Sequence, residues 1–224
     1  GVNALLSNTS GGGDIAIGYN AAAANLTGSS IVVIGDQAVP LGTGSYTTAV
    51  GVSTLKDLTT GVANSCFGYY TGWGITTGSS NVIIGGQASA LPGSRSNYVI
   101  INDGGGNTAF WKDSIGRAGI GTITPNSSLS VGGSFSAAYV AKTANYTATI
   151  NDYFIDCTSN SFTVTLPTAV GITGRMYIIK NSGSATIITT ATTSSETIDG
   201  TTPPTITTLV PLRVISDGAN WKTF

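Results

Sequence analysis

The chain has 224 residues, a net charge of −1, only 8% charged residues and no histidine. Its scattered Lys and Arg residues form no basic patch for nucleic acid, and no apolar run approaches the roughly 20 residues of a membrane-spanning helix. The lack of histidine excludes Ser-His-Asp, Cys-His and most zinc chemistry. Gly, Ser, Thr, Asn and β-branched residues dominate, and they favour short strands and tight turns, so we predict an all-β fold. So few charges also indicate that part of the surface is buried against partner chains.

A repeat with a period of about 17 residues covers the first half of the chain. Its clearest copies are IAIGYNA from Ile15, VVIGDQA from Val32, TAVGVST from Thr48, SCFGYYT from Ser65 and VIIGGQA from Val82. The glycines of these copies are separated by 17, 16, 17 and 17 residues, and a second set follows in step: Gly11, Gly28, Gly44, Gly61 and Gly78. A unit this short cannot bury its own apolar face, so successive copies must stack.

Each copy is expected to form one coil of a β-solenoid, with a short strand and two glycine turns. The position that follows the last glycine of the first set by one period is Asn102. Asparagine tolerates the left-handed backbone conformation better than most residues, so we expect Asn102 to replace glycine there.

Two apolar columns run through these strands. One contains Ile17, Ile34, Val50, Phe67, Ile84 and Ile101, and the other contains Ala16, Val33, Ala49, Cys66, Ile83 and Ile100. Consecutive strand residues point to opposite faces, so one column can fill the interior and the other needs an apolar surface from outside. Association of several copies would supply that surface, and we predict a parallel homotrimer. Cys66 then serves as a core residue, and we expect Cys157 to be a second buried thiol rather than part of a disulfide or metal site.

The repeats, of the form A-I/V-G-x-x-A with Thr-Gly between them, resemble the head repeats of trimeric autotransporter adhesins. Those repeats form left-handed parallel β-rolls packed as trimers, and similar repeats occur in phage tail fibres. The resemblance covers residues 1–106 and implies a β-roll that serves as a shaft or head. The turn segment is longer here than in the common adhesin repeat.

Residues 107–136 break the period and are predicted to be a connector. The stretch Gly119–Thr122, then Thr124-Pro125, then Leu129–Gly133 resembles a G-I-G-T-x-x-P-x-x-x-L-x-V-x-G connector that precedes the terminal modules of phage fibres. By its residues alone it is rich in turns, with one short alternating strand. Its G-x-G pattern is also compatible with a nucleotide loop, but no helix-forming sequence follows it.

Residues 137–224 contain strands of ordinary length at regular spacing, which predicts a β-sandwich or a jelly-roll-like domain. Asp217-Gly218 between two apolar runs predicts a hairpin, and we expect Trp221 to be a core residue of the last strand. The stretch 146–221 resembles a C-terminal module of phage and viral fibre proteins, which implies a distal knob.

Enzymatic activity is not predicted, and no cofactor or metal site is expected. The one enzyme class that these exclusions leave is the glycan depolymerase, which needs two carboxylates at a set separation across a groove. If coils stack with a step of 17 residues, Asp14 neighbours Ile31 and Asp36 neighbours Ser53, so no ladder of acids forms.

We therefore expect a tail-fibre component of a virion, extracellular, that attaches to a host-cell receptor, which we take to be a carbohydrate. Its other partners would be further copies of itself and other tail proteins, and neither nucleic acid nor membrane insertion is expected. Three alternatives stay open: a purely structural fibre spacer, a bacterial trimeric adhesin and a depolymerase tailspike.

Receptor-binding residues are expected on loops of the second domain, because recognition usually lies on loops held by a rigid scaffold. Glu196 and Asp199 are the candidate polar contacts, as charges in a charge-poor chain. Tyr70 and Trp73, in the variable half of one repeat, are the alternative candidates, because aromatic rings stack on sugars. The loops in question are 181–184, 193–204 and 217–220.

Overall fold

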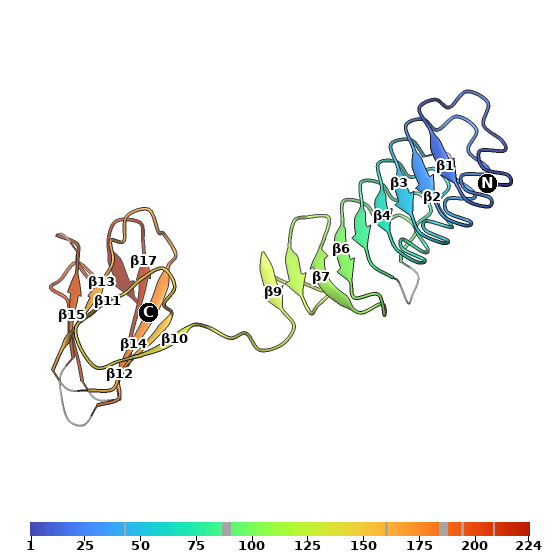
Figure 1. Ribbon diagram of the computed structural model, residues 1–224. Coiled ribbons are helices and arrows are strands. Elements are labelled where there is room, and N and C mark those ends of the chain that lie inside the picture. The colour runs from blue at the N-terminus through green and yellow to red at the C-terminus, as the bar shows by residue number, and fades with distance from the viewer. Residues whose placement is uncertain (43, 87–90, 160, 184–187, 194, 208) are drawn as a thin grey trace. The chain divides into compact units, whose positions relative to one another are not determined.

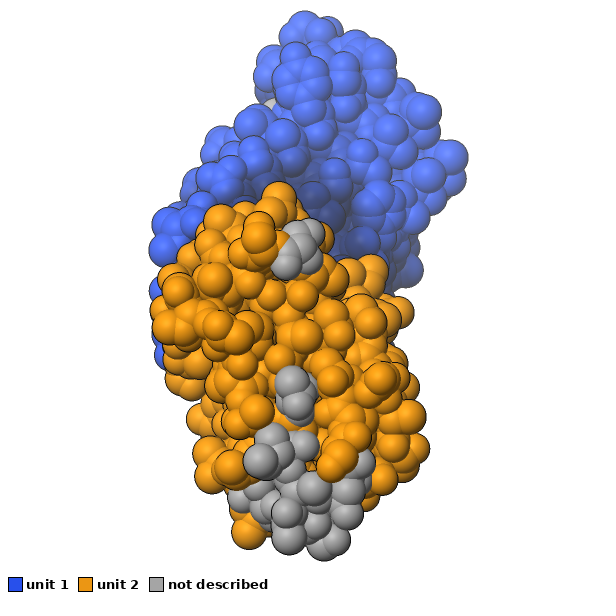
Figure 2. Space-filling model, turned by 90° about the vertical axis from the view of Figure 1, so that its left-hand side faces the viewer, with its two compact units in different colours: residues 1–134 blue, residues 135–224 orange. Residues whose placement is uncertain are grey.

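The computed structural model describes residues 1–42, 44–86, 91–159, 161–183, 188–193, 195–207 and 209–224. The chain divides into two compact units, residues 1–134 and residues 135–224 (Figure 1, Figure 2). Every regular element of the described residues is a β-strand, which confirms the all-β prediction. Within the same residues no helix is long and apolar enough to cross a bilayer.

A nine-stranded sheet runs through the first unit, with its strands in chain order from β1 to β9. The first six strands pair in parallel from one repeat to the next, with equivalent residues opposite each other, as Ala16 is with Val33 and Cys66 with Ile83. Figure 1 shows these strands side by side, each followed by a loop that leads to the next. The six strands are β1 (Ile15–Ile17), β2 (Val32–Ile34), β3 (Thr48–Val50), β4 (Ser65–Phe67), β5 (Val82–Ile84) and β6 (Val99–Asn102).

The two apolar columns face opposite sides of this sheet. The column through Cys66 and Ile83 is buried from Val33 to Ile100, with Ala16 partly buried, and it packs against loop residues such as Leu55 and Ile75. The column through Ile17 and Ile84 points outward, and these two side chains remain 56% and 43% exposed. The interior of the unit is thus filled by the second residue of each strand.

The two glycine sets are required for different reasons. Gly18 has a φ of +135°, and a Cβ atom there would also lie 2.4 Å from the carbonyl oxygen of Gly35. Gly61, in the second set, has no left-handed backbone, yet its Cβ atom would lie 2.1 Å from the carbonyl oxygen of Gly78. The second set therefore allows the backbones of adjacent repeats to approach closely, without the left-handed conformation of the first set. Asn102 was expected to replace glycine in a left-handed conformation. Instead it lies within β6 and its φ is not left-handed.

Three further strands extend the sheet beyond the repeats: β7 (Thr108–Lys112), β8 (Ala118–Ile120) and β9 (Leu129–Val131). The predicted connector thus contains three strands rather than one. Strands β6 and β7 pair antiparallel with Trp111 opposite Ile100, so the indole continues the buried column and is only 5% exposed. A large ring at this position closes the end of the apolar core.

The second unit contains two sheets that share one core. The five-stranded sheet has the order β10-β12-β14-β17-β18, and the four-stranded sheet has the order β11-β13-β15-β16. Buried side chains from both sheets, such as Ile179 and Val164, pack together, and Trp221 is fully buried among them as predicted. The strands are β10 (Tyr139–Lys142), β11 (Tyr146–Thr147), β12 (Phe154–Cys157), β13 (Thr163–Leu166), β14 (Met176–Asn181), β15 (Ile188–Thr192), β16 (Thr205–Ile206), β17 (Leu212–Ser216) and β18 (Trp221–Thr223).

The strand pairing of this unit differs from that of a jelly roll, which is built from antiparallel Greek keys. From β10 to β15 the chain changes sheet after every strand, and neighbours within each sheet are parallel. A parallel neighbour needs a crossover, and here the strand of the opposite sheet provides it. Antiparallel pairing begins with β16 and β17, and the predicted hairpin at Asp217-Gly218 is confirmed between β17 and β18.

Candidate functional site

Glu196, one of the two predicted polar contacts, is occupied within the chain. Its Oε1 accepts a hydrogen bond from the hydroxyl of Thr168 at 2.5 Å, and its Oε2 accepts one from the N–H of Ala169 at 2.9 Å. The side chain also borders an open hollow of about 570 Å³ with Thr197 and Thr201. Both oxygens therefore hold the segment before β16 against the segment after β13, and each accepts one structural hydrogen bond.

Asp199, the other predicted polar contact, is held in a similar way. Its carboxylate accepts hydrogen bonds from the N–H of Thr223 at 3.1 Å and from the Thr223 hydroxyl. These bonds lower the pKa of Asp199 below the ordinary value of an aspartic acid. Its backbone φ is +52° and its N–H donates to the carbonyl of Trp221, so Asp199 fixes a turn against β18.

Two of the predicted loops of the second unit, 193–204 and 217–220, are tied to one another. Asn220 accepts hydrogen bonds through Oδ1 from the N–H and hydroxyl of Thr197, at 2.9 and 3.1 Å. Asp217 caps its own turn through the N–H groups of Ala219 and Asn220. Residues 184 and 194 of the predicted binding loops lie outside the described residues.

An aromatic cluster, defined here as Tyr69, Tyr70 and Trp73, follows β4 in the first unit. The ring centroids of Tyr69 and Tyr70 are 4.5 Å apart with an interplanar angle of 64°, and those of Tyr70 and Trp73 are 6.0 Å apart at 81°. Tyr69 is 63% exposed and the other two rings are half-buried. The structure thus brings the alternative pair, Tyr70 and Trp73, together on the surface.

Lys56 completes this group, and sequence reasoning did not select it. Its Nζ lies 5.0 Å from the ring centroid of Tyr70 and 5.1 Å from that of Trp73. Cation–π contacts of this kind contribute about 0.5–1 kcal/mol each at exposed sites. The signal was present in the repeat, because Lys56 precedes Trp73 by one period of 17 residues.

The backbone around the aromatic cluster is fixed by both neighbouring repeats. Tyr70 donates its N–H to the carbonyl of Val52 at 3.0 Å, and the carbonyl of Trp73 accepts from Leu91 at 2.7 Å. Asp57 accepts the N–H of Gly74 at 3.1 Å. The rings are therefore carried on a rigid loop, as a binding platform requires.

This arrangement suits a neutral or anionic sugar. Aromatic faces pack against the apolar faces of sugar rings, while a lysine ammonium provides three donors for hydroxyl or acidic groups.

Several carboxylates of the chain accept structural hydrogen bonds. The predicted neighbours Asp14 and Ile31 are confirmed by a hydrogen bond of 3.1 Å from the Ile31 N–H to Asp14 Oδ1. Burial by itself raises the pKa of Asp152, but hydrogen bonds from Thr149 and Tyr146 outweigh it and hold that pKa below the ordinary value. The acid of a glycosidase needs a raised pKa instead.

Neither cysteine is suited to nucleophilic chemistry. Both are free and buried, as predicted. Burial raises the pKa of Cys66 to about 12 and that of Cys157 to about 11. A thiol reacts as its thiolate, which these values suppress at neutral pH. In the described part of the chain, no group of three or more Cys, Asp or Glu residues is placed to hold a metal ion.

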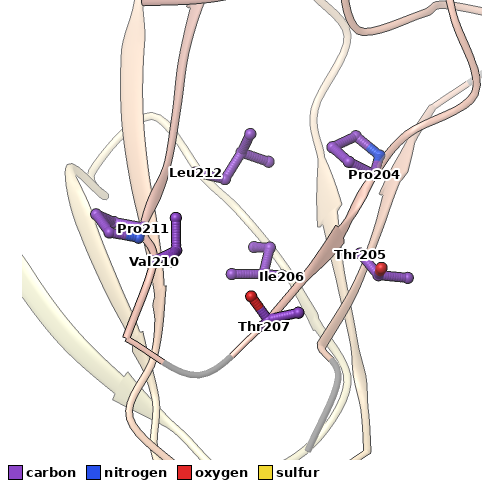
Figure 3. A pocket seen from close by; sticks show the side chains of 7 residues that line it. All are labelled: Pro204, Thr205, Ile206, Thr207, Val210, Pro211 and Leu212. Carbon is purple, nitrogen blue, oxygen red and sulfur yellow. The ribbon is translucent and has the colours of Figure 1, made fainter.

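A small apolar pocket in the second unit was not predicted. It has a volume of about 120 Å³ and lies between β16 and β17, where Figure 3 shows Pro204, Ile206, Val210 and Leu212 around it. Two proline-containing segments border it, and these were the signal available in the sequence. It offers no charged side chain and little room for a sugar unit.

No family model, no curated protein and no solved structure matches this chain.

Proposed function

We propose that this chain is a component of an extracellular trimeric fibre, the tail fibre of a virion, that attaches to carbohydrate on a host-cell surface. In this proposal the first unit is a β-roll shaft and the second is a β-sandwich knob. No catalytic step is assigned to it.

The observation that carries the proposal is the apolar outer face of β1 to β6. Parallel sheets occur almost only where both faces are covered, because apolar side chains extend from each face. Here the interior covers one face, and the other presents apolar side chains that are exposed on β1, β4, β5 and β6 and half-buried on β2 and β3. The most exposed members of this outer face are Ile15, Ile17, Phe67, Val82, Ile84 and Ile101.

A second copy of the same sheet is the surface best matched to this face. Identical repeats have identical spacing between strands, so apolar rows on parallel copies meet in register along the whole sheet. The preference for three copies comes from the resemblance of the repeats to adhesin heads and phage fibres.

The aromatic cluster with Lys56 is the proposed carbohydrate contact. Three copies would present the cluster three times, and multivalent attachment can exceed the affinity of one site by two or more orders of magnitude. Glu196 and Asp199 are assigned to loop structure instead, because their oxygens are engaged within the chain.

A blocking assay tests the attachment function. Host cells are incubated with the purified chain before challenge with the virus, and the chain is expected to reduce infection in proportion to its concentration. A double variant, Tyr69→Ser with Trp73→Ser, should lose this protection, whereas Glu196→Gln should retain it. Protection by neither the chain nor its variants would favour a structural spacer, which the tied loops of the second unit also support. Release of reducing ends from host polysaccharide would point to a depolymerase.

A further inference from the structure

Arg95, between β5 and β6, holds its guanidinium against two aromatic rings. The guanidinium carbon lies 4.5 Å from the ring centroid of Tyr98 and 4.5 Å from that of Trp111. The two rings contact each other edge to face, with centroids 5.4 Å apart. Because Trp111 belongs to the buried core, it fixes the position of the other two groups.

The backbone of Arg95 is held as firmly as its side chain. Its N–H donates to the carbonyl of Pro92 at 3.1 Å, and its carbonyl accepts from Asn81 Nδ2 at 2.7 Å. Asn81 is fully buried and itself bonded to Asn64. The arginine is thus preorganised by the repeat that precedes it.

This positive charge has no counter-charge in the described residues. Nε and Nη1 of Arg95 are buried, and neither makes a hydrogen bond there. The nearby carboxylate of Asp113 is engaged by Arg117 at 2.7 Å and by two backbone N–H groups. Burial lowers the pKa of Arg95, but an arginine remains protonated in proteins. A buried donor without an acceptor costs about 1–3 kcal/mol, and more when charged.

Two open hollows border the guanidinium. The first, of about 430 Å³, is lined by Arg95, Trp111, Arg117 and Asn126 among others, and the second, of about 370 Å³, shares Arg95 and Tyr98. Volumes of this order match those of small-ligand sites. The first hollow combines two guanidinium groups, one engaged carboxylate, an amide and aromatic surface, so its net charge is positive.

We infer that the larger hollow binds the carboxylate of an acidic sugar unit, with Arg95 as the paired cation. A carboxylate accepts two parallel hydrogen bonds from a guanidinium, which would satisfy the donors of Arg95 that lack an acceptor. Because Nε and Nη1 are buried, the guanidinium must turn away from Tyr98 or Trp111 to reach the carboxylate, which gives up part of a ring contact but no hydrogen bond at either nitrogen. The aromatic surface and Asn126 are then placed to contact the sugar ring and its hydroxyl groups. The choice of a sugar rests on the proposed attachment function, whereas the choice of a carboxylate rests on Arg95 alone.

The test is a titration of the full chain with methyl glucuronide and, separately, with the uncharged methyl glucoside, followed by calorimetry or NMR. We expect the glucuronide to bind about tenfold or more tightly than the glucoside, and to bind less tightly as salt is added. Arg95→Gln should reduce glucuronide affinity by about tenfold or more. Arg213→Gln removes the same charge from an exposed position of the second unit and should change nothing.

Equal affinity for the two sugars, no binding of either, or unchanged affinity in Arg95→Gln would overturn the inference. A changed oligomer mass in Arg95→Gln would also overturn it, because the missing acceptor would then be a carboxylate of a neighbouring copy. If this variant fails to fold, Arg95→Lys and the comparison of the two sugars on the unaltered chain still decide the question. The proposed attachment function is judged separately by the blocking assay, so glucuronide binding without protection would refute attachment and leave this site intact.

Discussion

At the scale of single residues, one loop position of the first unit has left-handed backbone in successive repeats. Asn20, Gln37, Ser53 and Tyr70 have φ values of 53°, 51°, 54° and 54°. Each donates its N–H to a carbonyl of the preceding repeat, at 2.8 to 3.0 Å. Small polar residues tolerate this conformation, whereas a bulky aromatic residue in it is uncommon and costs roughly 1–3 kcal/mol. Tyr46 and Val39 share this left-handed conformation outside the aromatic cluster, so it is a property of the repeat loops and not of binding.

Replacing Tyr70 by Asn should separate binding from stability. Asn accepts the left-handed conformation, so the melting temperature should stay within a few degrees or rise. Attachment to host cells should fall severalfold, because the central ring of the aromatic cluster is lost. Tyr46→Asn is a matched control, since Tyr46 has a φ of 58° and is 70% exposed outside the cluster. Equal loss of attachment in both variants would remove the cluster as the contact.

The network around Asp152 predicts a dependence of stability on pH. Tyr146 and Thr149 donate three hydrogen bonds of 2.7 to 2.8 Å to Asp152 Oδ2 and lower the pKa of its carboxyl below the ordinary value. A lowered pKa in the folded state means that the stabilisation is present at neutral pH and is lost as the pH falls below about 4. Urea midpoints of the full chain at pH 7 and pH 3 should therefore differ less in Asp152→Asn than in the natural sequence. Asp36→Asn, at an exposed site, should leave the difference unchanged.

At the scale of elements, the repeats are held at a spacing that leaves no room for a methyl group at certain glycines. The carbonyl oxygens that face Gly44 and Gly61 belong to the next repeat, at 1.8 and 2.1 Å from where a Cβ atom would be. Removing such an overlap requires the two backbones to separate, and this weakens the hydrogen bonds that join them. Glycine is required at these positions by the close stacking of adjacent repeats and not by a left-handed φ.

Gly61→Ala should therefore destabilise the first unit, by about 1–3 kcal/mol on the scale of overpacked sites. Gly12→Ala is the control, because no heavy atom lies within 4 Å of a Cβ atom there and its φ is not left-handed. Denaturation followed by the fluorescence of the tryptophans should show a lower midpoint for Gly61→Ala only. Similar midpoints for the two variants would contradict the close approach.

At the scale of the whole molecule, the first unit has one apolar face that it cannot cover by itself. Adjacent residues of β5 report on the two sides, because Ile83 is fully buried whereas Ile84 is 43% exposed. From the sequence, Ile84 was expected to be buried either in the interior or against other copies of the chain. In the folded single chain only the inner column is buried. Burial of the outer column would require contact with other copies.

Aspartate substitutions at these two positions should consequently have different effects. Ile83→Asp buries an unpaired charge and should cost several kcal/mol, enough to unfold the first unit. Ile84→Asp should leave one chain folded and reduce its oligomer to a monomer, as measured by light scattering at micromolar concentration and by circular dichroism. A monomer in the natural sequence, or a trimer that persists in Ile84→Asp, would refute assembly through this outer face.

The candidate site was only partly accessible from the sequence. Tyr70 and Trp73 were found because they are aromatic residues in the variable half of a repeat and aromatic rings can stack on sugars. Glu196 and Asp199 were chosen because charges are rare in this chain, but rarity does not reveal that Thr168 and Thr223 already engage them. Hydrogen bonds between residues more than twenty positions apart have no local pattern.

The sequence by itself determined where the strands of the repeats lie. Spacing of glycines and apolar pairs is a local, periodic property, and the segments from Ile15, Val32, Thr48, Ser65 and Val82 all begin strands as expected. The all-β fold could be predicted for the same reason, because strand and turn preferences act over a few residues.

Only the tertiary structure decided which apolar column is inside, since both columns are equally apolar in sequence. It also decided that β7 to β9 extend the first sheet and that the second unit alternates between two sheets with parallel neighbours. The lack of an acceptor for Arg95 became visible only with Tyr98 and Trp111 in place around it. Each of these features depends on pairing and burial between segments distant in the chain, which local periodicity does not specify.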